Sequence, residues 1–357
     1  MIWRTGNPAE ILENMYSDYD ISIKNLYFVN MELDGIQKQF FNHLKSTLPK
    51  HLSLADSMGE ILGLSQDSVY RRIRGEKPIT LDEIKILCEH FHISLDQVLQ
   101  LKSNTVVFLA PGLEHTNTDF TQYLKGMLSW MNNINSHEKR EMFYLSKDVP
   151  IFHFFHYPEL AAFKTFFWKK SIINHPDYEN ALFTLDNFEK KEEYALGQSL
   201  IKAYNELPST EIWNMECINS TVNQIEYYRE AGLFERPEDA SIVLESYEKT
   251  LNHIKVQGEK GRKFLKGMGE AGYRAPLKLY VNELILGNNT ILVEINGRRI
   301  SFVTYNVLDY LHTSDPRFND VTFSNFHTLA SRSTLISETG ERERNRFFNS
   351  LRKVVMK

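Results

Sequence analysis

The segment of the chain with the most suggestive chemistry is YRRIRGEK, which begins at Tyr70. It combines one glutamate with four cationic residues: Arg71, Arg72, Arg74 and Lys77. Arginine guanidinium groups pair in a bidentate manner with guanine edges and with phosphate oxygens, and a lysine ammonium binds phosphate as a point charge. An isolated basic cluster is more typical of a solvated helix face than of a binding site. The elements that surround the segment must therefore decide between these two interpretations.

Short amphipathic helices with clear boundaries surround this segment. Apolar residues at helical spacing predict a first helix over 36–48, and a second helix begins after Ser53 and stops at Gly63. Ser65 is the predicted N-cap of a third helix, which Gly75 ends. The basic cluster therefore lies on the third helix and in the turn that follows it.

Two further helices complete the pattern. The fourth opens at Thr80, and a fifth follows Ser94. The residues that the fourth helix is expected to direct inward are Leu81, Ile84, Leu87, Cys88 and Phe91. Five short helices, closely joined between residues 36 and 101, predict one compact all-helical unit.

Two helices joined by a short turn that contains Gly63, the second of them basic on its outer face, match the physical description of a helix-turn-helix. The DNA-binding domain of XRE/Cro-type repressors resembles the segment LADSMGEILGLSQDSVYRRIRGEKPITLDEIKILCEHFHISLDQVL. The matching features are Gly59, Gly63 in the turn, apolar Val69, the exit at Gly75, Pro78 and the terminal helix IS-LDQVL. The resemblance covers about one fifth of the chain.

In that family the second motif helix enters the major groove, so the resemblance implies which residues contact DNA. The positions implied to reach base edges are Gln66, Asp67, Ser68 and Arg71. Glutamine pairs well with adenine and arginine with guanine, whereas the residues suited to phosphate are Ser65, Ser68, Arg72 and Lys77. The full set of predicted DNA-contacting residues is Ser65, Gln66, Asp67, Ser68, Tyr70, Arg71, Arg72, Arg74 and Lys77.

The segment departs from the family pattern in three respects. The family commonly has a phosphate-contacting glutamine at the start of the first motif helix, which this chain lacks. The apolar residue after Val69 comes four positions later, at Ile73, instead of three, which leaves Arg72 where a core residue often lies. Asp67 is unusual because phosphates repel a carboxylate unless it accepts from a cytosine amino group or pairs with an arginine.

Composition and charge limit the classes of protein. With 357 residues, the chain is long enough for about two domains. It is 42% hydrophobic and 24% charged, which is typical of globular proteins and excludes collagen-like and wholly disordered classes. The formal net charge is −5, so any affinity for nucleic acid must come from a local basic surface instead of bulk charge.

No segment is apolar enough to predict a membrane span. The most apolar stretch, 149–163, is interrupted by two histidines, two prolines and a glutamate. The opening sequence MIWRTGNPAEILENM lacks the continuous apolar core of a secretory signal, so we expect a cytoplasmic protein. The two cysteines, Cys88 and Cys217, lie far apart in apparent helices, which favours core positions over a disulfide or a cysteine-based zinc site.

The sequence predicts three regions. These are a weakly ordered N-terminal extension over 1–34, a helix-turn-helix domain over 35–102 and a C-terminal sensor or dimerisation domain over 103–357. The first helical pattern follows Met31, which leaves Met1 and Met31 as alternative starts.

The C-terminal region is predicted to be mainly helical with a small sheet. Helices are expected at 119–134, 179–206, 211–231, 238–257 and 340–355. A strand is expected at 142–146, and an antiparallel meander near 278–305 consists of KLYVNELIL, TILVEIN and RRISFVTY, separated by Asn/Gly turns. The predicted fold class of the whole chain is therefore α+β, mostly α.

No motif in the C-terminal region predicts catalysis. His153, His156 and Glu159 are spaced as metal ligands on one helical face would be, but a proline and aromatic neighbours favour packed histidines. The serines at 331–337 lack a nucleophile elbow, and no phosphate loop is present. The segment GEKGRKFLKGMGEAG, which begins at Gly258, is predicted to be a flexible basic loop. We therefore predict no catalytic residue, no metal and no cofactor, and we expect that the chain is not an enzyme.

The primary hypothesis is a bacterial-type transcription regulator that binds double-stranded DNA as a homodimer. Its C-terminal domain would serve dimerisation, the sensing of a small-molecule effector, or both. One helix-turn-helix buries little surface on DNA, so specific binding normally needs two units about 34 Å apart. Two alternatives stay open: an enzyme with a DNA-binding appendage, and a helix-turn-helix that docks onto a partner protein.

Overall fold

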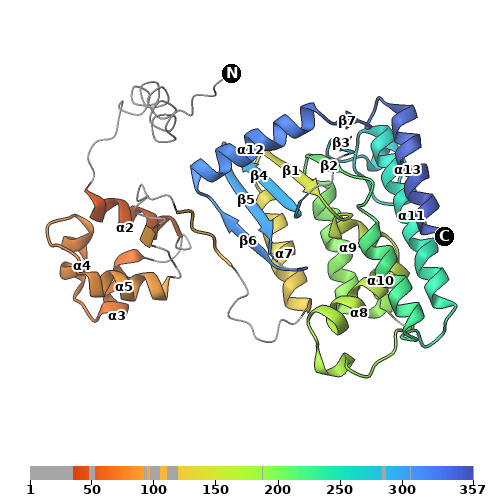
Figure 1. Cartoon of the computed structure of the whole chain (residues 1–357). Helices are drawn as coiled ribbons and strands as arrows, with labels where there is room; N and C mark the ends of the chain where they lie inside the picture. The colour runs from red at the N-terminus through yellow and green to blue at the C-terminus, as the bar shows by residue number, and fades with distance from the viewer. Residues whose placement is uncertain are drawn as a thin grey trace, which may run out of the picture. The chain divides into compact units, whose positions relative to one another are not determined.

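The computed structural model describes residues 35–47, 53–91, 93, 95–96, 105–110, 120–186, 188–283, 287–305 and 307–356. The chain forms two compact units, Met1–Val107 and Phe108–Lys357, both drawn in Figure 1. The predicted extension over 1–34, with both alternative starts, lies outside the described residues.

The described part of the N-terminal unit is helical. Its helices are α2 (Ile36–Thr47), α3 (Leu54–Leu62), α4 (Gln66–Ile73) and α5 (Leu81–His90). The predicted caps are confirmed, because the side chains of Ser53, Ser65 and Thr80 each accept a hydrogen bond from the backbone N–H three residues later. Of the predicted fifth helix, Ser94 and residues 97–102 lie outside the described part of the chain.

An apolar core holds these helices together. Its buried members are Phe40, Phe41, Leu44, Leu54, Ala55, Met58, Val69 and Leu87. Leu81 is 79% exposed, so its predicted inward position is wrong. Burial increases along α5 from Leu81 through Ile84 to Leu87, because only the later turns of the helix reach the core.

A seven-stranded mixed sheet organises the C-terminal unit. Its strands are β1 (Arg140–Ser146), β2 (Ser209–Trp213), β3 (Leu277–Val281), β4 (Thr290–Ile295), β5 (Arg298–Thr304), β6 (Tyr310–Thr313) and β7 (Thr334–Leu335). They lie in the order β6-β5-β4-β1-β2-β3-β7. Strands β1, β2 and β3 run parallel, and the other neighbouring pairs are antiparallel.

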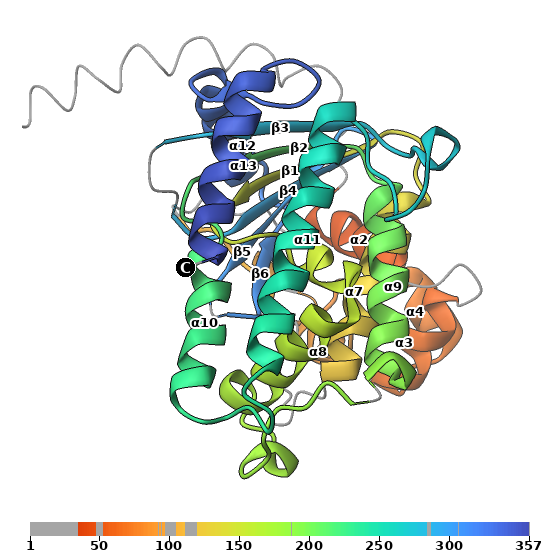
Figure 2. The same ribbon diagram turned by 90° about the vertical axis from the view of Figure 1, so that its right-hand side faces the viewer.

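Helices cover both faces of this sheet. They are α7 (Phe120–Asn135), α8 (Pro158–Phe167), α9 (Glu192–Asn205), α10 (Asn219–Glu230), α11 (Asp239–Lys260), α12 (Pro316–Ser331) and α13 (Glu341–Val355). Side chains alternate along β1, so Met142 and Tyr144 enter the main core with α7–α11 and α13, which Figure 2 shows in front of the sheet. Phe143 points to the other face, where Phe323 and Phe326 of α12 cover it.

Several predicted elements are confirmed, and others are corrected. The predictions at 119–134, 142–146, 238–257 and 340–355 correspond to α7, β1, α11 and α13. The predicted helix at 179–206 is shortened to α9, which begins only at Glu192, and the predicted helix at 211–231 is shortened to α10, because β2 occupies its first residues. Strand β2 is five residues long and buried throughout, so it has no alternation that would identify it in the sequence. The analysis of the sequence also missed α12.

The predicted meander near 278–305 is mostly right, because all three segments are strands and the last two are antiparallel neighbours. Strands β4 and β5 form a hairpin whose turn residues Asn296 and Gly297 have φ values of 50° and 81°, and β6 continues it. The first predicted strand, β3, pairs with β2 and β7 instead of β4. Because β1 and β2 lie between β3 and β4, the sheet is mixed, and pairing between strands so distant in sequence leaves no local signal.

The chain enters the C-terminal unit along the edge of this sheet. Leu109 exchanges backbone hydrogen bonds of 2.8 and 2.9 Å with His312 of β6, and Phe108 packs edge-on against Phe318 of α12. This segment covers part of an edge strand that would otherwise be open to pairing with another chain. In the described part of the protein, no helix has the length and apolar content that a membrane span requires.

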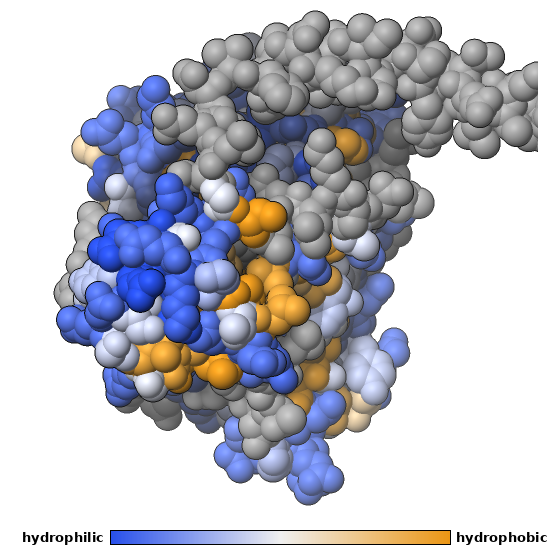
Figure 3. Space-filling model, turned by 90° about the vertical axis from the view of Figure 1, so that its left-hand side faces the viewer, coloured by the Kyte–Doolittle hydropathy of each residue, from blue (hydrophilic) through white to orange (hydrophobic). Residues whose placement is uncertain are grey.

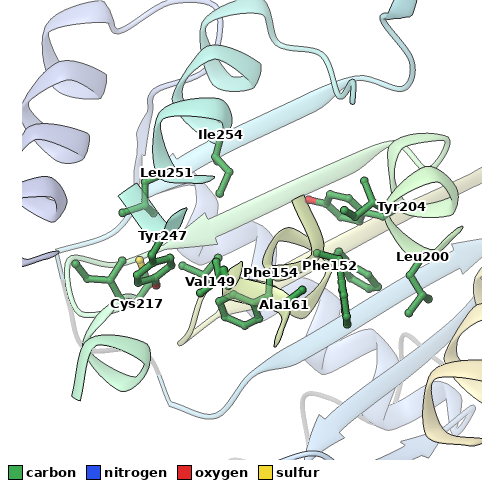
Figure 4. Packing of buried hydrophobic residues seen from close by; sticks show 14 of the residues in the cluster. Val149, Phe152, Phe154, Ala161, Leu200, Tyr204, Cys217, Tyr247, Leu251 and Ile254 are labelled. Atoms are coloured by element: carbon green, nitrogen blue, oxygen red, sulfur yellow. The ribbon is translucent and has the colours of Figure 1, made fainter. Parts of the chain in front are cut away.

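Aromatic side chains dominate the main core. Phe152 stacks on Tyr204 with ring centroids 4.7 Å apart, and Tyr247 lies beside Cys217 (Figure 4). Cys217 is a buried free thiol, as predicted, and burial raises its pKa, so the thiol stays protonated and unreactive. Cys88 is also free and half-buried.

A buried ion pair lies beneath the helices. Glu211 of β2 accepts hydrogen bonds from three neighbouring side chains, and the Lys263 ammonium lies 3.9 Å from its carboxylate. Lys263 is fully buried and donates to the carbonyl oxygens of Tyr204 and Leu207 at 3.3 and 2.9 Å. The prediction of a flexible basic loop is therefore wrong at this lysine. Burial lowers the pKa of Lys263 to about 7, and the neighbouring Glu211 carboxylate favours its charged form.

Two of the residues considered as metal ligands are packed histidines. His153 and His156 are buried, with 3.3 Å between Nδ1 of the first and Nε2 of the second, and His253 packs edge-on against His156. Burial lowers the pKa of His153 and His156 well below the ordinary histidine value, and neighbouring cationic groups add to the shift. Glu159 does not join them, because it accepts a hydrogen bond from Ser246.

We expect the C-terminal unit to lose stability as the pH falls through the ordinary histidine pKa of about 6.5. Histidines of the unfolded chain take up protons there, whereas buried His153 and His156 resist protonation, so acid favours the unfolded state. Together they should lower the free energy of unfolding at pH 5.5 by an amount on the order of 1 kcal/mol or more. Urea unfolding at pH 7.5 and 5.5 measures this loss. His153→Asn should reduce this loss of stability, whereas His327→Gln, at an exposed position, should not. The same loss in both variants would contradict the assignment of the pH dependence to the buried histidines.

Candidate nucleic-acid interface

Helices α3 and α4 form the predicted helix-turn-helix. The turn between them consists of Gly63, Leu64 and Ser65. Gly63 has a φ of 62°, in the left-handed region that strains residues with a Cβ. Gly59 of α3 is needed for its small size, because a Cβ there would lie 3.2 Å from the carbonyl oxygen of Leu64. Backbone geometry therefore explains both glycines of the motif.

Helix α4 has one buried and one exposed face. Val69 is fully buried and Ile73 half-buried, and both contact the core of the unit. The exposed side chains of the helix and its C-cap are Gln66, Asp67, Tyr70, Arg71 and Arg74. At about 100° per residue they span an arc of about 140° on the helix surface. The exposed arc therefore contains the two residues best suited to base edges, a glutamine and an arginine.

Arg72 is the exception among the predicted DNA-contacting residues. It is only 4% exposed, and its Nε and Nη2 donate to the two carboxylate oxygens of Glu83 in α5 at 3.1 and 2.7 Å. Its Nη1 donates to the backbone oxygen and the hydroxyl of Ser68 at 3.1 and 2.7 Å. The predicted phosphate role of Arg72 is therefore wrong. Because four residues separate Val69 from Ile73, Arg72 lies on the inward face of α4. Its ion pair with Glu83 of α5 offsets the cost of burying its charge.

Glu83 connects this ion pair to the start of α5. Its side chain accepts from the Thr80 N–H at 3.0 Å, and the Thr80 hydroxyl accepts from the Glu83 N–H at 3.2 Å, which completes a capping box. Burial raises the pKa of the Glu83 carboxyl, but the hydrogen bonds from Arg72 and Thr80 outweigh burial and leave the pKa below its usual value. One carboxylate thus holds α4 and caps α5.

Asp56 of α3 holds Gln66 at the start of α4. The Gln66 Nε2 donates to Oδ1 of Asp56 at 2.6 Å. A glutamine amide has two N–H donors and one carbonyl acceptor, so one donor and Oε1 remain for a bidentate pair with adenine. The sequence did not predict the role of Asp56, because nothing local connects residues on two different helices.

Two exposed arginines share one acidic partner. Arg74 donates to both carboxylate oxygens of Glu76 at 2.7 and 3.2 Å, and the Nε of Arg71 lies 3.8 Å from the same carboxylate. The hydrogen bond from Arg74 lowers the pKa of Glu76. Exposed ion pairs are weak in water, so phosphate oxygens can replace Glu76 as the partner of Arg74.

Gln37 of α2 closes the turn between α4 and α5. Its Nε2 donates to the carbonyl oxygens of Arg72 and Lys77, both at 2.7 Å, and its Oε1 accepts from the Ile79 N–H at 3.0 Å. Gln37 is not among the predicted functional residues, although the sequence contains a signal for it. Gln37 lies three positions before Phe40, on the apolar side of its helix, where a polar side chain needs a buried partner.

The surface of the N-terminal unit is mixed in polarity. Figure 3 views the molecule from the side on which this unit is drawn and shows a dense group of hydrophilic side chains with hydrophobic ones beside it. The exposed large hydrophobic residues described in this unit are Ile36, Tyr70, Leu81 and Ile86. Of these, Tyr70 lies on α4, where its ring is suited to contact a thymine methyl group.

We expect Glu83→Gln to destabilise the N-terminal unit by about 3 kcal/mol, because it leaves the Arg72 guanidinium buried without a charged partner. Glu76→Gln, the matched change in an exposed pair, should cost less than about 0.5 kcal/mol. Thermal unfolding of the full chain tests this by circular dichroism and by tryptophan fluorescence, since three of the four tryptophans lie in the C-terminal unit. Only Glu83→Gln should add an unfolding transition at lower temperature in the circular dichroism signal. Equal melting of both variants would contradict the role of the buried pair.

Comparison with known proteins agrees with this geometry. The family model described as the BetR domain matches residues 46–125. This domain is a helix-turn-helix-like DNA-binding domain found in bacterial regulators. The match includes α3, α4 and α5 and ends within α7. No curated protein and no solved structure matches the chain. The match and the exposed face of α4 together indicate DNA as a partner of the N-terminal unit.

Proposed function

We propose that the chain is a sequence-specific transcriptional regulator in which α4 enters the major groove of DNA. The observation that carries the proposal is the exposed face of α4, which presents Gln66, Tyr70 and Arg71. On the opposite face, Val69 and Arg72 fix the helix to its unit. The BetR match supports DNA binding and regulation. The resemblance to XRE/Cro-type repressors supports the mode of docking.

The side chains divide into base-reading and phosphate-binding groups. Gln66 would pair with an adenine and Arg71 with a guanine, each through two hydrogen bonds in the major groove. Arg74 and Lys77 follow at the end of α4 and in the next turn, where a cation suits the DNA backbone. Ser65, at the start of the helix, has an exposed hydroxyl suited to phosphate. Arg72 takes no part, because its donors are used inside the unit.

We infer that the regulator acts as a homodimer. A helix of eight residues reads a short half-site, and two such helices one turn of DNA apart read a palindrome with useful affinity. The C-terminal unit would provide the dimer contact and would respond to a small-molecule effector. The bacterial cytoplasm is the setting that this function implies.

Arg71→Ala should weaken binding to the preferred duplex by about 1 to 3 kcal/mol and relax the preference for one base pair, because a bidentate guanine contact is lost. Fluorescence anisotropy with the preferred and a scrambled duplex, at one fixed salt concentration, measures both effects. Arg298→Ala, at an exposed arginine of β5, serves as the charge-matched control and should leave both affinities unchanged. An equal loss on both duplexes would place Arg71 on phosphate instead of a base.

Selection of random duplexes on the full-length protein tests the proposed function as a whole. The expected product is a palindrome with half-sites about one helical turn apart. A single enriched half-site would overturn the homodimer but keep DNA recognition. Failure to retain any duplex, even at low salt, would overturn DNA binding, because phosphate contacts alone give measurable non-specific affinity.

A further inference from the structure

We infer that Gln37 is a positioning residue for DNA binding, which holds the turn between α4 and α5 so that Lys77 is presented to a phosphate. The inference rests on the proposed DNA-binding function. It concerns a residue on α2, outside the helix-turn-helix, whose side chain need not touch DNA.

The geometry shows one side chain fixing both ends of the turn. The Gln37 amide donates to the Arg72 carbonyl, in the last turn of α4, and to the Lys77 carbonyl within the turn, each at 2.7 Å. Its oxygen accepts from the Ile79 N–H at 3.0 Å, just before α5. Three hydrogen bonds from one amide define the path of the backbone more closely than a single contact would.

Apolar packing holds this turn only near its end, where half-buried Ile79 packs against the core. Residues 74–78 are all exposed, and Gly75 adopts a φ of 78° that reverses the chain direction after α4. Within the turn, the N–H groups of Glu76 and Lys77 bond to the Arg71 carbonyl at 2.8 and 3.2 Å. Up to Ile79 the path from α4 to α5 therefore depends on polar contacts, and Gln37 contributes three of them from another helix.

A fixed backbone matters most for a long, flexible side chain. An ordered lysine loses rotamer freedom when it binds, and a mobile backbone would add its own entropy to that loss. Preorganising the Cα of Lys77 removes this second cost and strengthens the phosphate contact. Phosphate contacts carry no sequence information, so the effect should be the same on every duplex.

The test is a double-mutant cycle on the full chain. Gln37→Met removes all three hydrogen bonds but keeps the length and helix propensity of the side chain. It should weaken binding to preferred and scrambled duplexes about equally, by roughly fivefold at low salt, and reduce the slope of log K against log salt by about 0.9, the value of one phosphate contact. Lys77→Ala should give the same change, and the double variant should bind no more weakly than Lys77→Ala alone. Asn42→Ala, at an exposed position of α2, is the control and should bind as the parent does.

Each other outcome overturns the inference in a recognisable way. Parent-like binding and salt slope in Gln37→Met would show that the clamp has no role in binding. Additive losses in the double variant would show that Gln37 acts through something other than Lys77. If Lys77→Ala binds as the parent does while Arg71→Ala is still impaired, Lys77 does not contact a phosphate. That result would overturn this inference but leave the proposed function standing. Loss of all DNA binding by the parent would be the failure of the proposed function itself.

A second variant separates positioning from folding. Gln37→Glu keeps an acceptor for the Ile79 N–H but places a carboxylate against the two carbonyl oxygens, so the donor half of the clamp is lost. Circular dichroism below the unfolding transition establishes that the variant is folded. A folded Gln37→Glu protein should show the same reduced salt slope as Gln37→Met, and a slope equal to that of the parent would contradict the inference.

Discussion

The buried ion pair between Arg72 and Glu83 is the interaction on which the orientation of α4 depends. A charge inside a small helical unit is expensive to desolvate, and it is stable there only when its donors are satisfied. The carboxylate of Glu83 and the oxygens of Ser68 engage Nε and both terminal nitrogens of the guanidinium. Rotation of α4 about its axis would break this pair, and Glu83, which also caps α5, would lose its cationic partner. The arc of α4 that carries Gln66 and Arg71 faces solvent because the Arg72–Glu83 pair fixes the opposite face of the helix to the unit.

The helix boundaries of the N-terminal unit could be predicted because their causes are local. A serine or threonine that caps the next turn, and a glycine in the left-handed region, are visible within four residues of sequence. The partners of Arg72, Gln66 and Gln37 lie on other helices, and no periodic pattern identifies them. Helical periodicity assigns a charged residue to solvent by default. The structure therefore places Gln66, Tyr70 and Arg71 on the exposed face of α4, as the sequence predicts, but buries Arg72.

In the C-terminal unit, too, features with local causes could be predicted and features with distant partners could not. The hairpin of β4 and β5 could be predicted because an Asn-Gly turn specifies it, whereas the parallel pairing of β1, β2 and β3 joins segments separated by whole helices. Lys263 looked like part of a basic surface loop because Glu211, the charge that draws it inside, lies far away in the sequence. Helical and alternating sequence patterns predicted an α+β fold, but only long-range contacts decide how large its sheet is.

Polar contacts have a particular task in the N-terminal unit. Its apolar core is small, and hydrophobic burial is non-directional, so it fixes the distance between helices better than their rotation. Base recognition depends more on the rotation of the helix, because a bidentate pair tolerates little error in the angle of a side chain. Asp56 on Gln66, Glu83 on Arg72 and Gln37 on the following turn each supply a directional constraint directly behind or beside the exposed face. Under the proposed function, these polar contacts are therefore the means by which a short helix presents two side chains accurately to DNA.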